Sequence, residues 1–319
     1  MLITEKNIFL HCKYKYTFLN VQNEVQNIDE ADYVFVCGYD FARDGFGEKL
    51  TEYMTKYKII VDSSSELIGG GTLDFFKEYK NLSNVTIYAN NVEPTLLEDF
   101  KTVKSLGCNI IMLPFFLKYY NYYEPLFVNR NLNKKKFLFH MGKPKPYRTA
   151  LLGLLSYYDL IKKGYVSYFN DNTLFYEDKY VNYYKSDSPK TQQEKVKMGL
   201  SKLPYEMVLD VEVFNHDIAH TRNMNCDYHI NVDFVLVGES DIREGVFFIT
   251  EKIGKCVLLD KKFILVGCKG LLKYTKEQCL IHLKKDISHL TDWCDTSYDE
   301  IDNIWDRINK VIDIINENI

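Results

Sequence analysis

The sequence predicts an α/β protein made of two Rossmann-like domains that face a central cleft, followed by a C-terminal amphipathic helix. Two observations support this fold class. Short apolar runs alternate with helical segments along most of the chain, and apolar residues in the last segment recur at helical spacing. Continuous apolar runs are typical of strands buried on both faces of a parallel sheet. Their alternation with helices predicts open, doubly wound sheets.

The first half of the chain contains apolar runs rich in Val, Ile, Phe and Tyr, separated by helical or loop segments. The strands expected here are 7–12, 32–38, 58–62, 85–89 and 109–113. The helices expected between them are 45–56, 73–79 and 94–106. Together they predict a first α/β domain over residues 1–133.

A second set of elements predicts another α/β domain over residues 134–297, after a basic linker at 131–135. Its expected strands are 136–141, 165–170, 232–238 and 263–267, with helices at 146–163 and 250–258. The tail 298–319 has apolar residues at helical spacing. This tail helix either crosses back to the first domain or caps the second.

Composition excludes several classes of protein. A chain of 319 residues with 46% hydrophobic residues is large enough for two cores. The net charge of -4 and the pI near 6.0 argue against a globally basic nucleic-acid binder. Eight cysteines without a C-x-x-C pair indicate a reduced, cytoplasmic compartment. No apolar run reaches the ~18 residues of a membrane span, and residues 1–10 lack the layout of a signal peptide.

A loop rich in Gly, Lys and Pro follows the expected strand 136–141 and leads into a helix. Gly142 allows close approach of the backbone to a ligand, and Lys143 raises the local potential. Pro146 suits the first turn of a helix, whose N-terminus attracts anions. Arg148 adds a guanidinium fork that fits phosphate. The alternative interpretation is an ordinary basic connection between a strand and a helix.

A second group begins with Gly238-Glu239-Ser240, where a buried strand ends, and continues with Thr250-Glu251-Lys252. Thr250 is a suitable N-cap. Glu251, in the first turn, can accept hydrogen bonds from ribose hydroxyls, and Lys252 can neutralise a diphosphate. The alternative is a capped helix with a solvated Glu-Lys face.

These two groups carry a resemblance to known families. Residues 137–168, with a Gly-Lys-Pro-x-Pro-x-Arg loop and a Leu-Leu-x-Leu-Leu helix, resemble the opening of the donor domain in a group of phage-encoded glycosyltransferase-like proteins. The block 233–273, with its Phe-Ile-Thr-Glu-Lys segment, is similar to the alpha-1,3-fucosyltransferase signature. Ser240 stands where that signature has Asn, and the spacer from Glu239 to Glu251 is two residues longer. The donor sugar therefore stays open.

The resemblance implies a GT-B fold and a metal-independent transfer of a hexosyl, fucosyl or pentosyl group from a nucleoside-diphosphate sugar to an acceptor hydroxyl. It implies that Arg148 and Lys252 hold the diphosphate, that Glu251 binds the ribose and that Glu239 lies near the donor sugar. No separate cofactor is expected. No metal is expected either, because acidic pairs of the Asp-x-Asp type are absent. His216, His220, Cys226 and His229 match no common zinc spacing.

An inverting transfer also needs a carboxylate that takes a proton from the acceptor hydroxyl. Asp62 and Glu66 follow the expected strand 58–62, and Asp40 follows the strand 32–38, so these three are the candidates. Helix capping or turn chemistry explains each of them equally simply.

The acceptor is expected to be a glycan, or a hydroxymethylated base in phage duplex DNA. DNA requires a basic rim, for which the sequence offers two sets of lysines: 134–136 with Lys143 and Lys145, and 261–262 with Lys269 and Lys273. The other class of function is a non-catalytic binding or structural module derived from a glycosyltransferase domain. Oligomeric state has no sequence signal.

Overall fold

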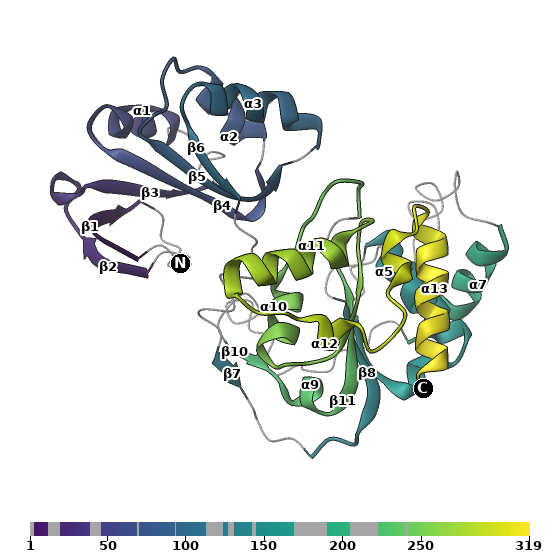
Figure 1. Ribbon diagram of the computed structural model, residues 1–319. Coiled ribbons are helices and arrows are strands. Elements are labelled where there is room, and N and C mark those ends of the chain that lie inside the picture. The colour runs from purple at the N-terminus through teal and green to yellow at the C-terminus, as the bar shows by residue number, and fades with distance from the viewer. Residues whose placement is uncertain are drawn as a thin grey trace. The chain divides into compact units, whose positions relative to one another are not determined.

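The computed structural model describes residues 3–11, 20–38, 46–68, 70–92, 94–112, 124–126, 131–141, 145–168, 190–204, 223–239 and 242–319. It confirms an α/β protein with two main parallel sheets (Figure 1). The chain divides into two compact units, Met1–Lys118 with Gly245–Thr250, and Tyr119–Glu244 with Glu251–Ile319. The sequence placed the boundary at 133–134 and gave no sign that 245–250 would group with the first unit.

The first unit contains a six-stranded parallel sheet in the order β2-β1-β3-β4-β5-β6. Its strands are β1 (Ile3–Leu10), β2 (Asn20–Val25), β3 (Tyr33–Cys37), β4 (Lys58–Ile68), β5 (Val85–Val92) and β6 (Asn109–Met112). Strand β2 was not predicted, because an edge strand with the sequence NVQNEV has almost no apolar pattern. The other strands overlap their predicted positions, although β4 continues to Ile68, beyond its predicted end at residue 62.

Helices α1 (Phe46–Lys56), α2 (Gly70–Lys77) and α3 (Leu97–Ser105) cover one face of this sheet (Figure 1). From β3 to β6 the chain moves in one direction across the sheet, and right-handed crossovers then place every connecting helix on the same face. One buried cluster joins the strands to these helices. It includes Val34, Val36, Leu50, Val61, Phe76, Ile87 and Val103.

The second unit contains a four-stranded parallel sheet in the order β12-β11-β8-β9. Its strands are β8 (Lys135–Met141), β9 (Gly164–Tyr168), β11 (Val232–Gly238) and β12 (Phe263–Val266). From β8 the sheet grows toward β9 on one side and toward β11 and β12 on the other. The crossover helices α5 (Pro146–Tyr157) and α10 (Glu251–Leu258) therefore lie on opposite faces (Figure 1). The reversal makes the border between β8 and β11 a topological switch point.

Smaller elements complete the described part of the chain. A short parallel pair joins β7 (Glu124–Leu126) to β10 (Asn223–Asn225). The single-turn helices are Ile28–Glu30, Pro94–Leu96, Leu160–Lys163, α9 (Asp227–Ile230), α12 (Ser288–Thr291) and Ser297–Glu300, and Cys279–Leu283 forms a π-helical turn. Within the described ranges, no helix is long and apolar enough to cross a membrane.

The predicted tail helix is α13 (Ile304–Glu317), which begins at an Asn303 cap and packs on α5. It is also joined to α7 (Lys190–Leu200), since Gln192 donates to the carbonyl of Trp305 at 3.4 Å and accepts from Asn309 at 3.2 Å. These contacts join α13 to the second unit, as expected for a helix that caps it.

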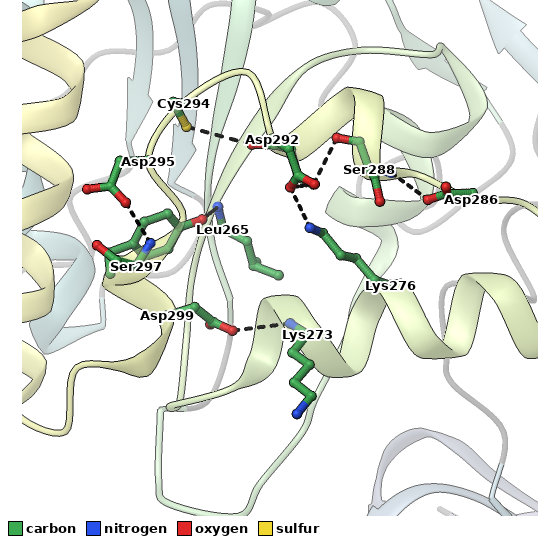
Figure 2. Close-up of polar contacts among 12 residues, drawn as sticks. Leu265, Lys273, Lys276, Asp286, Ser288, Asp292, Cys294, Asp295, Ser297 and Asp299 are labelled. Atoms are coloured by element: carbon green, nitrogen blue, oxygen red, sulfur yellow. Dashed lines mark hydrogen bonds and ion pairs between the residues drawn. The ribbon is translucent and has the colours of Figure 1, made fainter.

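The segment before α13, residues 297–303, forms hydrogen bonds with the edge strand β12 and with helix α11 (Leu271–Gln278) (Figure 2). The Asp299 carboxylate accepts hydrogen bonds from the backbone N–H groups of Leu272, at 3.0 Å, and Lys273, at 3.1 Å. The Tyr298 hydroxyl lies 3.1 Å from the backbone nitrogen of Leu265, which donates to it. The buried Arg307 donates to the backbone carbonyls of Ile301 and Asp302, within this segment, and to that of Gly267, which follows β12. The first turn of α11 is therefore capped by a carboxylate of the chain itself.

Helices α5 and α7 touch at two glycines, which yields a test of their packing. A Cβ atom on Gly199 would clash with the backbone carbonyl of Gly153, and neither helix backbone can move without disturbing its neighbours. We expect Gly199→Ala to lower the free energy of unfolding by ~1–3 kcal/mol. The matched control is Gly71→Ala on α2, where a Cβ meets nothing within 4 Å. Urea unfolding that finds both variants equally stable contradicts this packing.

Candidate functional site

The two segments singled out in the sequence meet at the carboxyl edge of the second sheet. Strands β8 and β11 are parallel neighbours, with Phe139 opposite Leu236, so their carboxyl ends lie side by side. Nε of Arg148, in the first turn of α5, donates to the carbonyl of Gly238 at 2.9 Å. The two segments therefore meet at this hydrogen bond, between α5 and the last residue of β11. It falls at the switch point, where open α/β sheets bind their ligands.

Burial separates the predicted donor-binding residues into two groups. Arg148, Glu239 and Thr250 are buried, with 3%, 0% and 3% of their surfaces exposed. Lys252 is partly exposed, alone among the predicted donor-binding side chains that the structure describes. A ligand at this edge would therefore meet Lys252 directly, while Arg148 and Glu239 lie beneath the surface.

Helix α10 brings a cationic pair toward the end of β8. His140, next to last in β8, has its pKa lowered to about 3, first by burial and then by the positive charges of Lys255 and Lys252. Glu239 is the nearby negative charge, which adds to the effect of burial in raising the pKa of the Cys256 thiol to about 12. Lys252, Lys255 and the buried carboxylate of Glu239 therefore lie near these strand ends. Sequence reasoning missed His140 and Lys255, because neither stands out by spacing.

The helix N-termini at this edge differ in what occupies them. Helix α11 follows β12, and its first turn is already capped by Asp299 (Figure 2). Helix α5 begins after Lys145, whose side chain makes no capping hydrogen bond and has no acceptor to offer. Helix α10 begins at Glu251, immediately after Thr250, as the sequence predicted. An external anion is therefore favoured near α5 over α11.

The predicted catalytic carboxylates belong to the first unit, and one part of their prediction was wrong. The strand expected to end at Asp62 continues as β4 to Ile68, so Asp62 and Glu66 lie within a strand and not beyond one. Asp62 is nevertheless opposite Cys37, the last residue of β3, and is buried. Asp62 therefore lies beside the carboxyl end of β3, although its own strand continues.

Thr250 was predicted as part of the donor domain, but it groups with the first unit, whereas Glu251 and Lys252 belong to the second. Within the first unit, Nδ2 of the buried Asn90 donates to the carbonyl of Ile249 at 3.4 Å. The chain therefore leaves the second unit after Glu244 and re-enters it at α10. This excursion explains why the spacer between Glu239 and Glu251 is long.

Several predicted residues lie outside the part of the chain that the structure describes. They are Asp40, Gly142, Lys143 and Ser240, together with His216 and His220. For Glu66 and Glu251 the structure describes the backbone and not the side chain. No group of three or more His, Cys, Asp or Glu residues that could hold a metal ion is found in the described ranges.

No protein-family model, curated protein or solved structure matched this chain.

A pH dependence of stability follows from the contact between His140 and His229, whose ring centroids lie 5.9 Å apart. Burial is the main cause that lowers both pKa values. Nε2 of His140 and Nδ1 of His229 are buried and have no hydrogen-bond partner among the described residues. Unfolded histidines bind protons near pH 6.5. As pH falls below that value toward about 3, the unfolded state binds more protons and the free energy of unfolding falls.

Each of the two histidines contributes a slope of up to ~1.4 kcal/mol per pH unit in this window. We expect His140→Gln and His229→Gln each to flatten the dependence, and the double variant to flatten it most. Urea unfolding at several values between pH 7.5 and pH 5 measures this. A double variant with the parental slope shows that these histidines are not responsible.

Proposed function

We propose that this protein is a glycosyltransferase of the GT-B type, and that it binds a nucleoside-diphosphate sugar at the switch point of the second sheet. The observation that carries the proposal is the junction between the first turn of α5 and the end of β11, joined by the Arg148–Gly238 hydrogen bond. This junction combines a helix N-terminus, a cationic pair on α10 and a buried carboxylate at the carboxyl ends of two parallel strands. That combination suits a ligand with both phosphate and hydroxyl groups.

The charges suggest how the leaving diphosphate would be stabilised. Lys252 has partial access to solvent, and Lys255 lies near it and is buried. Negative charge accumulates on the diphosphate as the bond to the anomeric carbon breaks, and fixed cations in a partly desolvated site stabilise it. Lys252 would contact the phosphates, and Glu251 would bind the ribose. Arg148 would act as a positioning residue, because its Nε is engaged by the backbone of β11.

The proton acceptor would come from the first unit. Asp62 is the candidate whose side chain the structure describes, and Glu66 and Asp40 remain the others. We assign the first unit to the acceptor because its strand β4 carries Asp62 and Glu66, whereas the phosphate-binding features are in the second unit. The donor sugar stays open among hexoses, fucose and pentoses.

The placement of lysines favours a glycan acceptor over duplex DNA. Each basic set expected from the sequence is divided between opposite edges of the second sheet. Lys134 and Lys261 precede strands at the amino edge, whereas Lys145 and Lys269 follow strands at the carboxyl edge. Lys134 and Lys136 are also paired with Asp233, at 2.9 and 3.4 Å. A salt-sensitive gel shift with duplex DNA carrying hydroxymethylated bases would restore the DNA alternative.

Thermal shift with a panel of nucleoside-diphosphate sugars tests the proposal, because a ligand that binds the folded state raises Tm. We expect one donor to raise Tm, and Lys252→Ala to weaken its binding more than tenfold by calorimetry, since a charge-assisted contact is lost. The matched control is Lys163→Ala, an exposed lysine before β9 at the other edge of the sheet. Arg148→Ala is a poorer test, because it also leaves the buried carbonyl of Gly238 without its donor.

Two results separate the competing functions. A donor that binds but is never turned over with any acceptor, nor hydrolysed, indicates a non-catalytic module derived from a transferase domain. A panel in which no nucleotide sugar raises Tm, or a Lys252→Ala variant that binds like the parent, contradicts the proposed donor site.

A further inference from the structure

A pocket of about 410 Å³ opens at the amino edge of the second sheet, opposite the edge that carries the proposed donor site. Lys134 lines it just before β8, and Asp233 and Phe234 line it at the start of β11. Lys261 and Lys262 line it just before β12. A volume in this range is typical of sites for small molecules, which occupy ~300–1,000 Å³.

The charges in this pocket are unequal. The Asp233 carboxylate is already shared by Lys134 and by Lys136, which lies nearby on β8. In the described part of the chain, neither Lys261 nor Lys262 forms an ion pair with a carboxylate. Nζ of Lys261 instead donates to the backbone carbonyl of Val232. The pocket therefore holds two ammonium groups whose charge is not neutralised.

The positive charge of Lys261 is disfavoured at its position in the pocket. Its pKa is lowered, mainly by burial, and repulsion from Lys134 and Lys262 adds to the effect while Asp233 opposes it. A partly desolvated ammonium group among like charges is stabilised by a bound anion. The ammonium group of Lys262, which lines the same pocket, makes a dianion more favourable than a monoanion.

The wall beside the lysines is apolar. The Trp293 and Phe234 rings pack with centroids 4.9 Å apart, and Nζ of Lys262 lies 5.7 Å from the centre of the Trp293 ring. Ile230 adds an apolar side chain that is 54% exposed. The cationic group thus adjoins a surface that would lose contact with water if an apolar body covered it.

We propose that this pocket binds a small organic phosphomonoester with an apolar body. The phosphate, which carries about -1.5 to -2 charges at pH 7, lies between the ammonium groups of Lys261 and Lys262. The body lies against Ile230 and Trp293. The volume of the pocket lies in the range of small-molecule sites, which favours such a ligand over the phosphate backbone of a nucleic acid.

Calorimetric titration of the full chain with three probes tests both parts of the site. Phenyl phosphate has the charge and the apolar body, inorganic phosphate has the charge alone, and benzyl alcohol has the body alone. We expect phenyl phosphate to bind at least tenfold more tightly than either of the others. We also expect Lys262→Gln to weaken phenyl phosphate at least tenfold, because a charged contact is lost. Lys262 is exposed and makes no hydrogen bond to the backbone in the described ranges, so this variant should fold normally.

The matched control is Lys163→Gln, another exposed lysine at the amino edge but outside the pocket. It should leave phenyl phosphate binding within twofold of the parent. Absence of binding by all three probes, or equal binding by the parent and Lys262→Gln, overturns the proposal. Equal affinity for phenyl phosphate and inorganic phosphate contradicts the proposed contact between the apolar body and Ile230 and Trp293. Salt-sensitive binding of single- or double-stranded DNA that Lys262→Gln abolishes would replace the small ligand with a nucleic acid.

Discussion

The second unit depends on one constraint, which is that the order in which strands are added to the sheet reverses at β8. Because β9 lies on one side of β8 and β11 on the other, right-handed crossovers must put α5 and α10 on opposite faces of the sheet. The carboxyl ends of β8 and β11 are then left between the two helices. Arg148 fixes this junction, since it ties the first turn of α5 to the last residue of β11. Every feature of the proposed donor site follows from that arrangement.

The buried charges of the second unit show which positions the fold holds most firmly. A buried ionised group is costly unless it is hydrogen-bonded or paired. Arg307 and Asp299 meet this condition with backbone groups and thereby close the first turn of α11. Arg148 and Glu239 are buried at the neighbouring strand ends. The chain thus uses its own carboxylate to occupy the N-terminus of α11, so an external anion is favoured near α5 instead.

Most strands were predictable because central parallel strands are continuously apolar, and β11 was predicted with its observed ends. The edge strand β2 was not predictable. An edge strand is less buried than a central one, and the sequence NVQNEV has almost no apolar pattern. The contact of Arg148 with the end of β11 could be anticipated from strand ends, but not its role as a structural link between α5 and β11. Burial depends on contacts between segments 90 residues apart, which no local pattern encodes. For the same reason the histidine pair and Lys255 escaped notice.

The same strands also separate the two proposed ligand sites. Strand β11 carries Glu239 just beyond one end and Asp233 near the other, and its seven residues span roughly 23 Å at ~3.3 Å each. This length exceeds the Debye length of ~8 Å at physiological ionic strength, so exposed charges at the two edges are largely screened from one another. The two edges should therefore bind independently. Coupling between them would require β11 itself to move, and its hydrogen bonds to both β8 and β12 oppose that movement.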